Sequence, residues 1–200
     1  MPLQNRVMPT GEIVADPARG LFTGNRGILH GPDRTLGVRR WQHPHWVTCT
    51  LDHPRGIYHG PMPDRRWTAL FFLDEAVASA AGHRPCGYCR PEAYRAWKAA
   101  FGPGYDRLAV DRALHTARVT PARVQVRHDA AIEGLPDGAF VLSGGAAQLV
   151  WGPRLLPFQP DGYGPAKPRP RGQVTVLTPR PTIGILRAGY RPAVHPSAKV

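Results

Sequence analysis

The sequence predicts an α+β fold in which a short antiparallel sheet with helices precedes a β-rich C-terminal part, a meander or a small barrel. The chain has 200 residues, 42% of them hydrophobic, which is enough for a core. Its 23 prolines and 22 glycines favour many turns and short elements over long helices. Runs rich in β-branched and aromatic residues flank a central block with helical periodicity, and no internal repeat is present.

The first half begins with loops and short strands up to about residue 40. β-Branched and aromatic residues, which favour extended backbone, then predict strands at residues 46–51, 56–59 and 68–72. Asp74 is placed to cap a short helix by accepting hydrogen bonds from the free amides of its first turn, and Gly82 is placed to end it in the left-handed conformation. A small sheet followed at once by a helix is therefore expected.

Two further helices are expected in the middle of the chain. The first begins at Pro91, because a proline at the first helical position lacks no needed N–H. Tyr94, Trp97 and Phe101 recur on one face of this helix, and the Gly-Pro-Gly run at 102–104 ends it. This run is the expected boundary between two closely joined regions, residues 1–102 and 103–200. The next helix is expected from Asp106 to about residue 117.

The C-terminal region has the pattern of a meander. Residues 138–143 and 146–151 alternate as two strands around a Gly-Gly turn, and a third strand follows at 154–158. A loop rich in proline and glycine (160–172) precedes a strand at 174–177, and a short helix at 182–188 ends at Gly189.

The chain is strongly basic, with a formal net charge of +12 spread over both halves. Such a charge is typical of proteins that bind nucleic acids, because arginine and lysine neutralise phosphates and release counterions. Codon bias toward arginine is the alternative explanation, since most of the basic residues are arginine and alanine, glycine and proline are abundant. No run is long enough to span a bilayer, and no secretory pattern opens the chain. We expect a cytoplasmic, nucleoid-associated protein.

Cys86 and Cys89 form a CxxC pair in the segment HRPCGYCRP. A thioredoxin-like redox pair opens a helix after a buried strand, whereas here a helix and Gly82 come first. A zinc knuckle fits the segment better, because Gly87 permits the tight turn and the following helix N-terminus favours thiolate charge. The alternative is a metal-free fold with buried cysteines.

Zinc requires four ligands, so two more are expected upstream of the knuckle. Cys49 is the remaining thiol and lies in a predicted strand. For the fourth ligand the sequence leaves His30, His59 and His53 open.

The run FFLDEAVASAAGHRPCGYCRPE resembles the second half of the zinc module of Ada-type DNA alkylation-repair methyltransferases. That module has an Ala-rich short helix and then an R-P-C-x-x-C-[RQ]-P knuckle. The likeness extends weakly upstream, through GIYH at 56–59, and covers about residues 46–92. It implies that Cys86 and Cys89 bind zinc beside DNA. The chain as a whole also resembles uncharacterised bacterial proteins with NRGxxH, RRW and GHRPCxxCR segments.

The same resemblance exposes a departure from the repair family. The module's methyl-accepting cysteine is replaced here by His59, and Pro63 stands at the second ligand position of that motif. A neutral imidazole does not accept alkyl groups in this way, so the resemblance does not carry methyl transfer over to this chain. Cys49 is the remaining thiolate nucleophile, at another place in the motif.

Cationic and aromatic residues interleave in two segments and surround the knuckle. Arginine pairs phosphates and tryptophan stacks on exposed bases, so these residues predict contacts with duplex or single-stranded DNA. The alternative is that the tryptophans pack in the core beside solvated arginines. The candidates are Arg39, Arg40, Trp41, Arg65, Arg66, Arg84, Arg90, Arg95 and Lys98.

The sequence contains no phosphate-binding loop, nucleophile elbow or HExxH motif. We therefore expect a zinc-stabilised DNA-binding protein linked to DNA repair or damage response. The alternatives are an enzyme on damaged DNA, either an alkyl acceptor or a nuclease, and a zinc-stabilised module that binds a protein partner.

Overall fold

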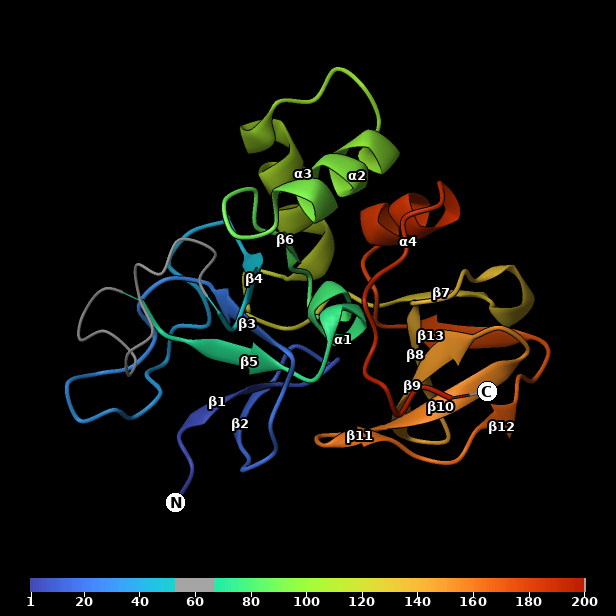
Figure 1. The fold of residues 1–200 in the computed structure, drawn as a ribbon, viewed down its shortest axis with the longest axis horizontal. Coiled ribbons are helices and arrows are strands. Elements are labelled where there is room, and N and C mark those ends of the chain that lie inside the picture. Colours follow the sequence, from blue (N-terminus) through green and yellow to red (C-terminus); the bar gives the residue numbers. More distant parts are fainter. Residues whose placement is uncertain (53–66, 200) are drawn as a thin grey trace.

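The computed structural model describes residues 1–52 and 67–199. Within these residues the chain forms two sheets and four α-helices, and α1 lies between the sheets (Figure 1). The predicted α+β class is confirmed. The helices and most of the expected strands sit close to their expected positions, and the strand expected at 56–59 lies outside the described residues. The structure adds short strands at Arg84–Pro85 and His128–Ala131, and two more within the loop expected at 160–172, which the sequence did not predict.

The first sheet has the strand order β2-β1-β5-β3-β4-β6. It is mixed and not purely antiparallel, because β1 pairs in parallel with β5, and β4 with β6. Parallel pairs need long connections and join segments far apart in the chain, so local patterns do not reveal them. Its strands are β1 (Gln4–Val7), β2 (Ile13–Ala15), β3 (Phe22–Asn25), β4 (Val47–Thr50), β5 (Leu70–Phe72) and β6 (Arg84–Pro85).

The second sheet is antiparallel throughout, in the order β11-β10-β9-β8-β13-β7 with β12 beside β10. Strands β8 to β10 form the expected meander, which β11 continues, and β13 and β7 extend the sheet beyond β8. Gly144 and Gly145 have φ values of 59° and 77°, as a two-residue hairpin turn between β8 and β9 requires. Its strands are β7 (His128–Ala131), β8 (Phe140–Ser143), β9 (Ala146–Trp151), β10 (Arg154–Gln159), β11 (Gly162–Tyr163), β12 (Lys167–Pro168) and β13 (Gln173–Val176).

The helices are α1 (Glu75–Ala80), α2 (Pro91–Phe101), α3 (Arg107–Arg118) and α4 (Arg180–Arg187), with a 3₁₀ turn at Ile132–Gly134. The expected N-caps are present: Asp74 accepts from the Val77 amide at 2.9 Å, and Asp106 from the Ala109 amide at 2.6 Å. Helices α2 and α3 both pack against α4 (Figure 1). None of the helices in the described part of the chain is long and apolar enough to cross a membrane.

The two sheets share a hydrophobic core. One cluster joins Leu70 and Phe72 of β5 to Phe140 and Leu149 of β8 and β9, and α1 packs on both β5 and β8. A second cluster under α2, α3 and α4 includes Trp97, Leu114, Val141 and Ile185. The expected boundary near residue 102 therefore separates two segments of sequence whose side chains pack together.

Candidate metal centre

The structure brings together the three cysteines that the sequence singled out. Their Sγ atoms all lie within 4.8 Å of one another. The parallel register of β4 and β6 causes this convergence, because it pairs Thr48 with Pro85 and so sets Cys49 beside Cys86 one step further on. The Cys86 amide donates to the Thr48 carbonyl at 2.9 Å, and this hydrogen bond holds Cys86 beside β4.

The three thiols lie close enough to shift one another's pKa. The hydrogen bond from Cys49, together with the backbone amides of Tyr88 and Cys89, lowers the pKa of Cys86 to about 5. The pKa of Cys89 is also lowered, chiefly by its hydrogen bond from Cys49, and hydrogen bonds to both partners raise the pKa of Cys49 itself. Hydrogen bonds among the three sulfurs thus favour thiolate at the two knuckle positions over thiolate at Cys49.

A soft divalent cation fits this donor set. Tetrahedral zinc at a Zn–S distance of ~2.3 Å places its sulfurs ~3.8 Å apart, a spacing compatible with the cysteine cluster. Thiolate ligands select zinc or iron–sulfur chemistry over magnesium or calcium. Among the described residues these three cysteines are the side chains positioned to hold a metal ion.

His30, one of the histidines expected as the fourth ligand, is not part of this cluster, and that prediction is wrong. Its Nδ1 contacts Thr68 Oγ1 at 3.2 Å and its Nε2 contacts the Gln4 carbonyl at 3.1 Å. Both ring nitrogens are thereby engaged in the first sheet, and burial lowers the pKa of His30. His59 and His53 lie outside the described residues.

Arg84 and Arg90 were expected to face phosphates, and the structure corrects both expectations. The Arg84 guanidinium is buried and pairs bidentately with Asp111 of α3, at 2.6 and 2.7 Å. Arg90 pairs bidentately with Glu75 of α1, at 3.0 and 2.8 Å. A carboxylate partner of this kind offsets the cost of burying a guanidinium. The two arginines therefore clamp the knuckle, one at each end, to two different helices.

Asp111 is the centre of a buried network that the sequence did not mark. Burial by itself would raise the pKa of Asp111, but the hydrogen bonds and charge of Arg84, together with His45 at 2.7 Å, hold the pKa below its ordinary value. The sequence contained one sign that Asp111 is buried: it lies between Val110 and Leu114 on the apolar side of α3.

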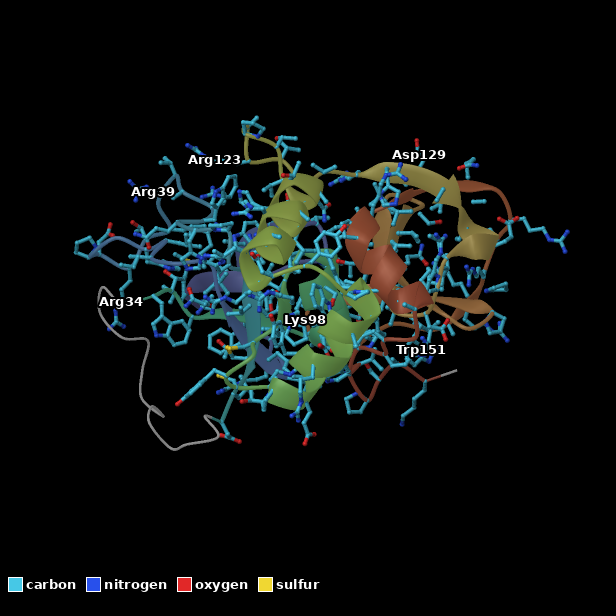
Figure 2. All side chains as sticks on the ribbon, turned by 90° about the horizontal axis from the view of Figure 1, so that it is seen from above. Arg34, Arg39, Lys98, Arg123, Asp129 and Trp151 are labelled. Carbon is cyan, nitrogen blue, oxygen red and sulfur yellow. The ribbon has the colours of Figure 1, made fainter. Side chains whose placement is uncertain are left out.

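The remaining nucleic-acid candidates lie at different depths. Arg39, Arg95 and Lys98 are exposed, whereas Arg40 is half-buried and donates to the Gly37 carbonyl at 2.6 Å. Trp41 is half-buried, with its ring centroid 5.8 Å from that of Trp46 and 5.2 Å from that of His115. Figure 2 shows Arg39 and Lys98 on separate parts of the molecule. Arg65 and Arg66 lie outside the described residues.

Arg95 and Lys98 border a shallow hollow of about 410 Å³ between the end of α2 and the loop that follows. Its other lining residues include Tyr94 and Tyr105, and Tyr105 is 51% exposed. The hollow adjoins the knuckle turn, because the Tyr94 ring packs so closely on Gly87 that a β-carbon there would lie 3.0 Å from it.

Comparison of the chain with protein-family models, with curated proteins and with solved structures finds no match. The likeness of the knuckle segment to the Ada-type module therefore stays a prediction from sequence motifs. Function has to be argued from the cysteine cluster and the side chains around it.

Proposed function

We propose that this chain is a zinc-stabilised DNA-binding protein that presents Arg95 and Lys98 of α2 to the phosphate backbone. The observation that carries this proposal is their position. Both are exposed beside the hollow, next to the knuckle, and neither makes a hydrogen bond or ion pair with a described residue. Two free cations beside the exposed ring of Tyr105 match the chemistry that binds phosphates and stacks bases.

The zinc ion has a structural role in this proposal. Thiolates from β4 and from the turn before α2 would bind it, and the clamps through Arg84 and Arg90 would then fix where α2 begins. Structural zinc contributes folding free energy directly, so small elements that lack a large core are held in place by it. A fixed start of α2 fixes the direction in which its cationic face points.

The charge of the whole surface supports the same function. Exposed arginines and lysines outnumber exposed acidic residues in the described part of the chain. A surface of this kind attracts a polyanion from a distance, although the attraction is screened beyond ~8 Å at physiological salt. Such a surface gives sequence-independent affinity, and the hollow supplies a local contact.

The test is DNA affinity as a function of salt for duplex and single-stranded oligonucleotides. Each lost phosphate contact is expected to reduce the slope of log K against log salt by ~0.9 on duplex DNA. We expect the double variant Arg95→Ala/Lys98→Ala to reduce the slope by about two such contacts and the affinity at low salt by ~10-fold or more. Arg154→Ala/Arg171→Ala is the matched control, since it removes the same charge from exposed positions near the second sheet.

Equal losses of DNA affinity in the two double variants would show that binding depends on the general charge of the protein and not on the hollow beside α2. A flat salt response in the unmodified protein would contradict DNA binding altogether. It would instead support a zinc-stabilised module for a protein partner.

A further inference from the structure

Two arginines are buried on Trp46 at the junction of the first sheet with α3. Arg26 is 2% exposed and Arg118 is 1% exposed. The Cζ atom of each guanidinium lies 3.9 Å from the centroid of the Trp46 ring. Cation–π contact of this kind stabilises a desolvated guanidinium, but it leaves the N–H donors at the edge of the group to find other partners.

The direct partners of these arginines are neutral. Arg26 Nε donates to His83 Nε2 at 2.8 Å, and Arg118 donates to the Gly82 and Pro44 carbonyls at 2.7 and 2.6 Å. His83 accepts at Nε2 because its Nδ1–H faces the Val47 carbonyl at 3.0 Å, and burial lowers the pKa of this histidine.

The nearby acidic group is already engaged elsewhere. Asp111 is the carboxylate that acts on Arg118 electrostatically, but its oxygens bond to Arg84 and His45. Arg26 Nη2 and Arg118 Nε are consequently buried donors without a partner in the described residues. Unpaired buried charge is expensive, so a pair of cations in this state is suited to binding an anion.

Repulsion from neighbouring cations adds to this cost. Burial, followed by the charge of Arg40, lowers the pKa of Arg26 to about 9. Burial, followed by the charge of Arg26, lowers the pKa of Arg118 well below its ordinary value. An anion that accepts from both groups would offset the cost of their burial and of the repulsion between them.

Both arginines line one cavity of about 110 Å³. Sites for drug-sized ligands measure ~300–1,000 Å³, and one water takes ~30 Å³ of liquid, so this cavity suits a small oxyanion and not a whole nucleotide. Glu12, held by Thr10 Oγ1 at 3.0 Å, is the acidic member of the lining and is exposed. The lining also contains Gly11, Arg40, Trp41, Trp46, Ala81, Val119, Arg123 and Gln125.

We infer that this cavity is a binding site for a phosphate-class oxyanion that accepts from Arg26 Nη2 and Arg118 Nε. Guanidinium groups suit tetrahedral oxyanions because their planar donors match two oxygens at a time. Arg40 and Arg123 add positive charge at the cavity wall. The site shares no lining residue with the hollow on α2, so the test of this site is independent of the test of the proposed DNA binding.

Titration of the full-length protein with inorganic phosphate tests the inference, followed by ³¹P NMR and by the Tm at constant ionic strength. We expect saturable binding, and at about 100 times Kd a rise in Tm of ~5 °C or more over the same concentration of chloride. Arg26→Met should abolish both signals. Arg123→Ala, at an exposed lining position, should weaken binding by ~3-fold or more without affecting folding, because exposed sites contribute little to stability.

Arg112→Ala is the matched control for Arg123→Ala, since Arg112 is exposed and does not line the cavity. Phosphate salts stabilise many proteins non-specifically, so a rise in Tm that is the same in all variants would overturn the inference. Absence of saturable phosphate binding in the unmodified protein would also overturn it.

The oxyanion has two sources, a free phosphate or the end of a nucleic-acid strand. Oligonucleotides with a 5′-phosphate or a 5′-hydroxyl, each competed with inorganic phosphate, distinguish them. Tighter, phosphate-sensitive binding of the 5′-phosphorylated strand that is weakened in Arg123→Ala assigns the site to strand ends. Equal binding of the two strands assigns it to free phosphate.

Discussion

The buried arginine, histidine, aspartate and glutamate side chains of the described residues all lie between Arg6 and Arg118. The buried side chains with polar groups after them are uncharged: Gln148, Tyr163, Thr178, Thr182 and Tyr190. The first sheet and α1–α3 are thus organised around charge pairs and a thiol cluster. The second sheet is organised around apolar packing in a local meander. This contrast indicates that the first region depends on specific partners, while the second is stabilised by area buried from water.

Short strands explain why the first region needs such partners. The strands β5 and β6 span three and two residues, and β6 attaches to the sheet through the parallel pair with β4. Strands this short contribute few backbone hydrogen bonds, so the cysteine cluster and the two arginine ion pairs hold β6 against α1 and α3. The hairpin of β8 and β9 needs no such device, because neighbours in sequence pair directly.

The largest effect is expected from the metal centre. Cys86→Ser should remove bound zinc and lower the free energy of unfolding by more than ~4 kcal/mol, the range that loss of a metal reaches. Metal analysis of the purified protein and urea unfolding measure the two quantities. Leu149→Ala is the comparison from the other sheet: it should cost ~2–5 kcal/mol through its cavity and leave the zinc content unchanged.

The same metal analysis tests whether zinc is bound and which histidine is its fourth ligand. Less than about half an equivalent of zinc in the unmodified protein would contradict the zinc centre. His59→Ala and His53→Ala, compared with each other, decide between the two histidines that the sequence leaves open. The one that supplies a ligand should lower zinc affinity by more than the ~10–100-fold that outer-shell changes cost.

An intermediate effect is expected from Asp111→Ala. It leaves Arg84 buried without its partner, which should cost ~3–5 kcal/mol in urea unfolding. The control is Asp129→Ala on β7, whose exposed carboxylate accepts from Thr175 Oγ1 at 2.9 Å and should matter far less. The double variant Arg84→Met/Asp111→Leu should recover much of the loss. Similar costs for Asp111→Ala and Asp129→Ala would contradict the contrast between the two sheets.

The smallest effect is a pH dependence from His83. Burial holds its pKa well below 6.5 in the folded state, so the unfolded chain takes up the proton first. Stability is therefore complete above about pH 6.5 and falls below it by up to ~1.4 kcal/mol per pH unit. His83→Gln keeps one acceptor and one donor and should flatten the slope of unfolding free energy between pH 6.5 and 5.5. An unchanged slope would assign the pH dependence to other histidines.

Features encoded by neighbouring residues could be predicted from the sequence. The caps at Asp74 and Asp106, the proline at the start of α2, and the Gly-Gly hairpin all depend on contacts within a few residues. The prediction that Cys49 joins the CxxC pair rested on Cys49 being the remaining thiol and not on any local pattern. The burial of Arg84 and Arg90 was predicted wrongly. An arginine beside a knuckle looks the same in the sequence whether or not the fold places a carboxylate next to it.

By itself the sequence determined the α+β class, the meander, the helix ends and the CxxC turn, because each depends on side-chain period, turn chemistry or capping. The tertiary structure decided which charges are buried and what they meet. Arg84 meets Asp111 across 27 residues, and Arg26 meets His83 across 57. Such pairs depend on how β4, β6 and α3 come together, since burial of a charge is settled by the surrounding packing and not by the residues next to it in the chain.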